Sequence, residues 1–285
     1  MNVTLRPGNA ADAQRCGEIC YNAFKAIAEQ HNFPPDFPSP EVATGLLAGL
    51  LAHPGFYSVV AEIEGKIVGS NFLDERSIVA GLGPITVDPY VQNRAIGRHL
   101  MQVALDRVKE RRFPGVRLLQ AAYHNRSLSL YARLGFVARE PLSTMQGSPP
   151  AVQVPGYGVR PATELDLDAC NQICVKVHGH DRAGELLDAI KKETATVVEH
   201  AGRITGYASS IAFFGHAVGE TNEALKALIG AAPAFGGPGF LVPTRNAELF
   251  RWCLENGLRI VQPMTLMSRG LYSEPIGAFL PSVLY

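Results

Sequence analysis

The feature that most constrains this chain of 285 residues is an internal repeat. A hydrophobic residue, an arginine and a proline are followed at fixed distances by an aspartate, a cysteine, an isoleucine and a second cysteine. Because self-similarity of this kind indicates copies of one structural unit, the chain is expected to contain the same fold twice. The two copies are Leu5, Arg6, Pro7, Asp12, Cys16, Ile19 and Cys20, and Val159, Arg160, Pro161, Asp166, Cys170, Ile173 and Cys174.

Two further blocks repeat in the same order and divide the chain. Residues 64–69 resemble residues 201–206, and residues 130–136 resemble residues 252–258. The stretch between the copies is rich in Pro and Gly, which favours a linker. We therefore predict a first domain at residues 1–146, a linker at residues 147–156 and a second domain at residues 157–285.

The hydrophobic pattern of the first domain switches between the strand period and the helix period, which predicts an α/β fold with a mixed sheet. Asn9 and Ser39 are typical helix N-caps, and Glu64 with Gly65 indicates a hairpin turn. The predicted strands cover residues 3–6, 57–62, 66–72, 84–87, 116–121 and 136–139, and the predicted helices cover residues 9–27, 96–111 and 126–133, with one more starting at Ser39.

Composition excludes several classes of partner. The chain has 26 basic and 26 acidic residues, whereas a nucleic-acid-binding protein favours a basic face. No apolar run is long enough to cross a bilayer, and the N-terminus lacks a basic segment followed by an apolar core. Five cysteines without a dense framework suit a reducing compartment. We expect a cytoplasmic protein with no nucleic-acid or membrane partner, either a monomer or a homodimer.

Two groups of residues invite comparison with metal sites. The paired cysteines of the repeat lie one helical turn apart on apolar faces, which is typical of buried thiols and is not the usual spacing for zinc. Residues 178–181, His-Gly-His-Asp, fit a polar loop after a helix. We therefore predict no metal.

A strand that runs through a tight loop into a helix predicts an anion site at residues 85–98. The first N–H groups of a helix lack an internal partner and face the positive end of its dipole, so a pyrophosphate placed there gains several donors. Ala95 and Gly97 are small enough for close approach to the backbone. Arg94 and Arg98 can add charge-assisted contacts.

This segment resembles the pyrophosphate loop of the GNAT superfamily of N-acetyltransferases, which reads Q/R-x-x-G-x-G/A after the fourth strand. Residues 92–97 fit it, with Ala95 in place of the first glycine. A second family landmark, N-x-x-x-x-x-L-Y-x-x-x-G-F, matches at residues 130–136, while His124 stands at the leading Asn position and Asn125 follows it. The resemblance covers about residues 1–146, and it reaches the second copy through the repeat.

The resemblance implies two GNAT-like domains, each a twisted, mostly antiparallel sheet flanked by helices. It also implies a ternary complex in which an amine, here expected to belong to a small molecule, attacks acetyl-CoA directly. Acetyl-CoA is therefore the expected co-substrate. The expected coenzyme contacts are Ile85, Val87, Gln92, Asn93, Arg94, Ala95, Ile96, Gly97, Arg98 and Asn125.

The same resemblance assigns catalytic roles. A main-chain N–H near Val87 would polarise the thioester carbonyl, and Tyr131 would act as the general acid toward the leaving thiolate. The base that deprotonates the amine is open: Asp74 and Glu75 follow the third strand, His124 is another candidate, and a water chain can replace all three.

The second copy lacks a phosphate loop with its helix, which predicts a degenerate domain that is structural or forms one wall of the acceptor pocket. Cys253 stands where the first copy has its tyrosine. Because a base is missing and the second copy is degenerate, a non-catalytic acetyl-CoA-binding regulator or scaffold is the alternative function.

Overall fold

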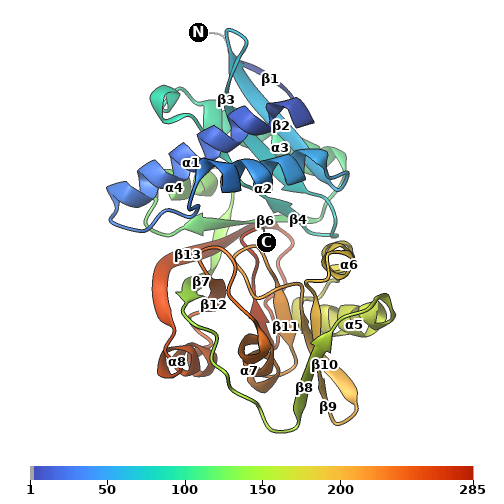
Figure 1. Ribbon diagram of the computed structural model, residues 1–285. Coiled ribbons are helices and arrows are strands. Elements are labelled where there is room, and N and C mark those ends of the chain that lie inside the picture. Colours follow the sequence, from blue (N-terminus) through green and yellow to red (C-terminus); the bar gives the residue numbers. More distant parts are fainter. Residues whose placement is uncertain (1–2, 285) are drawn as a thin grey trace.

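The computed structural model describes residues 3–284, and two β-sheets organise it (Figure 1). The larger sheet has nine strands in the order β1-β2-β3-β4-β6-β13-β7-β12, with β5 paired to β3 off this path. The smaller sheet has the order β14-β11-β10-β9-β8. All named strand pairs among the described residues are antiparallel except β4 with β6, which confirms the predicted mixed α/β fold.

Apart from its last strand, which lies beside β12 in the lower part, the first half of the chain forms the upper part of Figure 1, with α1 and α2 packed against each other. Its elements are β1 (Val3–Pro7), α1 (Ala13–Gln30), α2 (Pro40–Ala52), β2 (Phe56–Ile63), β3 (Lys66–Asp74), β4 (Ala80–Leu82), β5 (Thr86–Val87), α3 (Ile96–Glu110), β6 (Gly115–Ala121), α4 (Asn125–Arg133) and β7 (Val137–Gln146).

The second half forms the lower part of the same view. Its elements are β8 (Tyr157–Pro161), α5 (Leu167–His178), α6 (Ala183–Lys191), β9 (Thr196–His200), β10 (Arg203–Ala208), β11 (Ala217–Gly219), α7 (Asn222–Ala231), β12 (Phe240–Pro243), α8 (Ala247–Glu255), β13 (Arg259–Gly270) and β14 (Ala278–Leu280).

The arginine and the aspartate of the sequence repeat form the same ion pair in both halves. Arg6 donates two hydrogen bonds of 2.8 Å to the carboxylate of Asp12, and Arg160 donates two of 2.8 Å to Asp166. Each aspartate also closes a capping box on the short 3-10 turn that precedes the next helix. The two halves therefore begin with the same strand, turn and helix, held by the same contacts.

The hairpins show the same correspondence. Glu64 and Gly65 both have positive φ, 51° and 73°, and Ala201 and Gly202 repeat these values at 50° and 75°. Two consecutive left-handed residues form the turn whose twist matches the flanking strands. The predicted hairpin at residues 64–65 is confirmed, and the second half contains its counterpart between β9 and β10.

Two strands differ from the sequence-based expectation. The strand predicted at residues 84–87 is confined to Thr86–Val87, because Pro84 has no N–H to donate to a ladder. The strand predicted at residues 136–139 continues to Gln146, because β7 gains partners from the second half on both edges.

The last strands of the two halves are exchanged. β13 lies between β6 and β7, and β7 in turn lies between β13 and β12. The ladder between β13 and β6 runs from Met264 opposite Ala121 to Gly270 opposite Gly115. The larger sheet thus contains strands from both sides of the predicted linker. The division of the chain into two domains at residues 147–156 remains a prediction.

In the second half, a terminal strand takes the place next to β11. β14 pairs with β11 in antiparallel register and also packs against β12. Helix α7 begins at Asn222, directly after β11, and the hydroxyl of Thr221 accepts a hydrogen bond from the N–H of Ala224. The second half therefore has neither a long loop before this helix nor an open gap beside β11.

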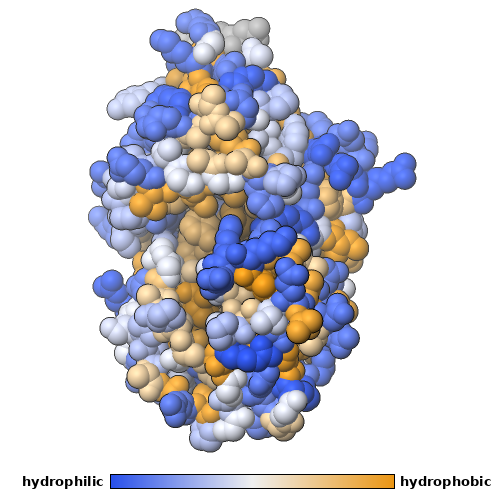
Figure 2. All heavy atoms as spheres, turned by 45° about the vertical axis from the view of Figure 1, so that its right-hand side comes forward, coloured by the Kyte–Doolittle hydropathy of each residue, from blue (hydrophilic) through white to orange (hydrophobic). Residues whose placement is uncertain are grey.

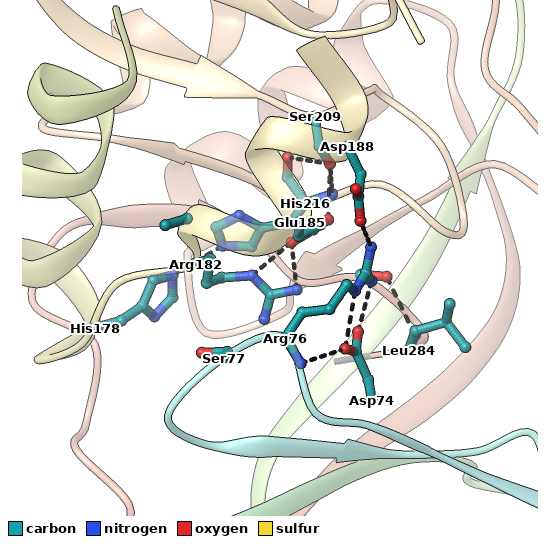
Figure 3. Close-up of polar contacts among 12 residues, drawn as sticks. Asp74, Arg76, Ser77, His178, Arg182, Glu185, Asp188, Ser209, His216 and Leu284 are labelled. Carbon is teal, nitrogen blue, oxygen red and sulfur yellow. Dashed lines mark hydrogen bonds and ion pairs between the residues drawn. The ribbon is translucent and has the colours of Figure 1, made fainter. Parts of the chain in front are cut away.

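Polar contacts join the halves beside α6 (Figure 3). Arg76, just after β3, pairs with Asp74 at 2.6 Å and with Asp188 of α6 at 2.8 Å. Ser77 donates to the carbonyl oxygen of Asp181 at 2.9 Å. These contacts hold the end of β3 against the second half.

A buried histidine cluster lies close to this interface. The Nε2 atoms of His178 and His216 are 3.1 Å apart, and both rings are almost fully buried. Burial and the nearby guanidinium groups of Arg117 and Arg182 hold the pKa of each imidazole well below its usual range. Burial also lowers the pKa of His180 to about 4, so the cluster folds in its neutral form.

We expect the free energy of unfolding to decrease as the pH falls below 6.5, the ordinary pKa of histidine. The unfolded chain binds protons at that pH, while the folded cluster does not, so each buried histidine costs about 1.4 kcal/mol per pH unit below 6.5. Denaturant unfolding at about pH 7.5 and about pH 5.5 measures the difference.

The double variant His178→Asn/His216→Asn should lose about 2.8 kcal/mol per pH unit of this dependence, two residues at about 1.4 each, while His180 and His124 keep their share. His200→Asn, at the partly exposed end of β9, should keep the full dependence. Since other titrating groups are common to all three proteins, their effects cancel in the comparison. An unchanged pH dependence in the double variant would contradict the assignment.

Candidate active site

A cavity of about 740 Å³ lies in the first half and is closed on one side by the second half. Its walls come from α1, the loop before α3, β5, β6 and α4, together with residues of the second half. Figure 2 shows apolar surface gathered between the two halves, flanked by hydrophilic residues. The cavity thus lies where the strand exchange brings both copies of the repeat together.

The cavity forms where β5 and β6 separate. β4 pairs with β3 and also, in parallel through Ala80 and Gly81, with β6, whereas the paired neighbour of β5 is β3. Thr86 and Val87 line one side of the resulting gap, and residues 119–121 of β6 line the other. A flat molecular group can enter between the two strands at this point.

Hydrogen-bonding groups at Val87 point into the gap. The N–H of Asp88 donates to the carbonyl oxygen of Val68 on β3 at 2.8 Å. Since backbone groups alternate along a strand, the N–H of Val87 faces away from β3 and toward the gap. On that same side, the amide of Gln92 donates to the carbonyl oxygen of Val87 at 3.2 Å.

The loop before α3 delivers the N-terminus of this helix to the cavity. Asn93 and Ala95 both have left-handed backbone conformations, with φ of 67° and 60°. Gly97 and Arg98 belong to the first turn of α3, and both line the cavity. The arrangement presents the first N–H groups of the helix to the cavity, as an anion site requires.

Arginines surround this end of the cavity. Arg98 of α3, and Arg126 and Arg133 of α4, all line it. Arg126 also donates to the side-chain oxygens of Gln92 at 3.2 Å and Asn93 at 3.4 Å, which ties α4 to the loop. Sequence reasoning missed Arg126 and Arg133, although both lie within the segment matched to the second landmark.

Tyr131 lies in the middle of α4, lines the cavity and is only 7% exposed. Within residues 3–284 its hydroxyl makes no hydrogen bond to another protein group. Burial raises the pKa of this phenol above its usual range, so the group keeps its proton at neutral pH. A protonated hydroxyl without a protein partner can donate to a bound molecule.

Residues 23–136 match the model of the acetyltransferase (GNAT) family. The first half carries a GNAT acetyltransferase domain. The match covers the loop before α3 and Tyr131, the two parts of the site described above. No curated protein sequence matches the chain.

Solved structures show that the tandem arrangement is an established fold. A Pyrococcus horikoshii protein proposed to be an acetyltransferase superimposes with a TM-score of 0.75 at 17% identity, over 97% of this chain and 94% of that one. A GCN5-related N-acetyltransferase from Sphaerobacter thermophilus superimposes with a TM-score of 0.62 at 16% identity, over 95% of this chain and 96% of that one. A tandem GNAT protein of the clavulanic acid biosynthesis pathway superimposes with a TM-score of 0.57 at 13% identity, over 94% of this chain and 98% of that one.

Within the GNAT domain, the structure brings most of the expected coenzyme residues to one cavity. Arg94 and Asn125 are exceptions, because neither lines it, and Asn125 points to solvent at the start of α4. The expected residues that do line the cavity are Ile85, Val87, Gln92, Asn93, Ala95, Ile96, Gly97 and Arg98. Their role in binding remains a prediction.

The structure argues against Asp74 and Glu75 as bases, because neither lines the cavity. Asp74 is held by Arg76, and Glu75 accepts two hydrogen bonds from Arg107, at 2.7 Å and 3.1 Å. A carboxylate paired with a guanidinium outside the cavity has no access to an acceptor amine. Both residues support the end of β3 instead.

His124, the third candidate base, does line the cavity at the N-terminus of α4. Burial, with Arg126 and His31 nearby, lowers the pKa of its imidazole to about 4. A group of this basicity is neutral at pH 7 and withdraws a proton poorly from an alkylammonium, whose pKa is about 10. His124 is therefore suited to hydrogen bonding more than to proton abstraction.

One part of the cavity wall is formed by α1, residues 36–37 and the second half, and we call it the acceptor wall. It is mostly apolar, and its members are Ala23, Phe24, Ala26, Ile27, Gln30, Asp36, Phe37, Phe213, Phe214, Met264, Val283 and Leu284.

Within residues 3–284, no group of three or more His, Cys, Asp or Glu side chains has the geometry to hold a metal ion. None of the helices in that range combines the length and apolar character needed to cross a lipid bilayer.

We expect Ala95 to tolerate glycine and to reject a branched residue. Left-handed backbone costs an L-residue roughly 1–2 kcal/mol, and a β-branched side chain more. Ala95→Gly should raise the thermal midpoint and bind coenzyme A at least as tightly as the wild type, while Ala95→Val should weaken binding about tenfold. Calorimetry with coenzyme A measures both, and Gln102→Val, on α3 outside the cavity, is the control. Equal affinities for Ala95→Val and wild type would contradict the role given to this loop.

Proposed function

We propose that this protein transfers the acetyl group of acetyl-CoA to an amine of a small molecule, by direct attack in a ternary complex. The observation that carries the proposal is the single cavity, which joins the N-terminus of α3, the gap between β5 and β6, Tyr131 and the acceptor wall. Family membership supports acetyl transfer in general. The geometry supports a specific arrangement of the two substrates.

The coenzyme would enter along α3 and α4. Its diphosphate would accept hydrogen bonds from the N–H groups of the first turn of α3, where the helix dipole is positive. Arg98, Arg126 and Arg133 would add charge at the same end. The acetyl thioester would then reach the gap between the strands.

Thioester activation would rest on the backbone of β5. Attack by an amine places negative charge on the carbonyl oxygen, and a fixed donor aimed at that oxygen lowers the barrier. The N–H of Val87 faces the gap and is held in place by the pairing of Asp88 with Val68. A donor that is already oriented needs no rearrangement during the reaction.

Tyr131 would assist the departure of the thiolate. Its phenol is protonated at neutral pH and makes no hydrogen bond to another protein group within residues 3–284. The hydroxyl can donate a hydrogen bond to the sulfur as the carbon–sulfur bond breaks and can relay a proton to it. Its surroundings in α4 and the apolar core beneath keep the ring in one orientation.

The second half would contribute a wall and no second coenzyme site. β14 fills the position beside β11, and the turn before α7 is capped by the chain's own Thr221. Phe213, Phe214 and Met264 instead face the cavity of the first half. A coenzyme site in the first half alone is consistent with the degenerate second copy inferred from the sequence.

Tyr131→Phe should lower kcat about 100-fold, within the range expected for losing a general acid, while leaving coenzyme A affinity within twofold. Release of free thiol from acetyl-CoA measures turnover across a panel of primary amines, and calorimetry measures coenzyme binding. Tyr157→Phe, on β8 of the second half, is the matched control and should retain full activity. Full turnover in Tyr131→Phe would remove the tyrosine from the mechanism.

The same assay separates the proposal from its alternative. If the wild type bound the coenzyme but acetylated none of the amines, the protein would be a non-catalytic acetyl-CoA-binding regulator or scaffold. Absence of coenzyme binding would contradict both.

A further inference from the structure

The acceptor wall favours a molecule with an apolar body. Aromatic rings line it in a connected group: the ring centroids of Phe24 and Phe37 are 6.0 Å apart, those of Phe37 and Phe214 are 6.4 Å apart, and those of Phe213 and Phe214 are 5.6 Å apart. Two of these rings belong to each half of the chain. Burial of apolar surface against them would supply binding energy for an aliphatic or aromatic acceptor.

One acidic side chain interrupts this wall. Among the described residues that line the cavity, Asp36 is the only carboxylate. It lies in the connection between α1 and α2, next to Phe37. A single negative charge within an apolar wall is a specific feature, because burying an unpaired carboxylate is costly unless a ligand repays it.

Asp36 is held from the second half of the chain. The amide of Gln262, on the exchanged strand β13, donates to its Oδ1 at 2.9 Å. The amide oxygen of Gln262 in turn accepts a hydrogen bond of 3.2 Å from the hydroxyl of Tyr123. The ring of Tyr123 stacks on Phe33 with centroids 4.3 Å apart. The carboxylate is therefore fixed in direction by Gln262, whose own amide is held by Tyr123.

Within residues 3–284 no cationic side chain pairs with Asp36, whose hydrogen-bond partner is the neutral amide of Gln262. The titratable groups that face it are Cys20 of α1 and Tyr123, and burial raises the pKa of both above their usual ranges, so both are neutral at pH 7. A cation from outside the protein would complete the site.

We propose that Asp36 binds the ammonium group of a primary amine with an apolar body and accepts its proton before attack on the thioester. This inference rests on the proposed function and names the class of acceptor for it. Amines that also carry a carboxylate, such as α-amino acids, are disfavoured, because their carboxylate is repelled by the carboxylate of Asp36.

The proton inventory of the reaction balances with this role. The ammonium gives one proton to the Asp36 carboxylate, and the freed nitrogen lone pair attacks the carbonyl carbon. The carbon–nitrogen bond forms, the carbon–sulfur bond breaks, and the remaining excess proton on nitrogen passes to the thiolate through Tyr131. The products are the amide, coenzyme A as its thiol, and one proton on Asp36 that returns to solvent.

The acidity of Asp36 suits this exchange. Burial raises the pKa of its carboxyl to about 6, while the hydrogen bond from Gln262 limits the rise. The carboxylate is therefore charged at neutral pH and is a better proton acceptor than an exposed aspartate. It is also a stronger base than His124, whose pKa is lowered to about 4.

The first test compares acceptors on wild type and Asp36→Asn. Wild type should acetylate 2-phenylethylamine with a kcat/KM at least 100-fold above that for phenylalanine, which differs by one carboxylate. Asp36→Asn should lower kcat/KM for 2-phenylethylamine about 100-fold, as removal of one member of a buried charge pair does. The ratio of kcat/KM for 2-phenylethylamine to that for phenylalanine should become smaller in this variant. Asp36→Glu should retain part of the activity.

The second test follows the pH dependence. In wild type, kcat/KM should fall as the pH drops through about 6, because Asp36 becomes protonated. Asp36→Asn should lose this acidic limb. Gln262→Met should move the limb to higher pH, because the hydrogen bond that lowers the pKa of Asp36 is removed. A positioning role predicts this displacement, whereas a purely structural role for Gln262 leaves the limb in place.

Two controls separate this inference from the proposed function. Asp106→Asn, on α3 outside the cavity, should leave all acceptor kinetics unchanged, and calorimetry should give equal coenzyme A affinity for Asp36→Asn and wild type. Active wild type with an equally active Asp36→Asn variant would overturn the role of Asp36 and leave acetyl transfer intact. A wild type without turnover on any amine would overturn the proposed function itself.

Discussion

The backbone ladder that β13 forms with β6 and β7 is the constraint on which the rest of the structure depends. Each of these strands obtains hydrogen-bond partners from the other half of the chain, so neither half completes its sheet alone. The exchange carries Met264 from the second half to the cavity of the first, and it carries Gln262 to Asp36. A single ladder therefore links the fold of both halves to the geometry of the site.

This arrangement separates the two tasks of the cavity. The first half supplies the strand gap, the helix N-terminus and the arginines, which are suited to a phosphorylated coenzyme. The second half supplies much of the apolar wall and fixes the carboxylate that we assign to the acceptor. Substitutions in the second half can then alter acceptor choice while the coenzyme contacts stay unchanged, because different elements carry each set.

Local sequence signals predicted the local structure well. The Asn9 cap, the hairpin at residues 64–65 and the start of α3 each depend on residues close together in the chain, and the repeated arginine and aspartate form a repeated ion pair. Strand exchange has no such signal, since β13 and β6 are far apart in sequence. The position of Glu75 outside the cavity has no sequence signal for the same reason: it pairs with Arg107 of α3, a contact that only the fold reveals. Asp36 reaches the cavity through the path of the α1–α2 connection, which no motif marks.

The central claim is that the cavity of the first half binds coenzyme A through the loop before α3 and that the second half binds none. A crystal structure of the protein with coenzyme A tests it most directly. The account predicts one coenzyme per chain, its diphosphate against the backbone of residues 95–98 and its sulfur between β5 and β6 beside Tyr131. A coenzyme bound beside β11, or a diphosphate placed away from this helix N-terminus, would contradict it.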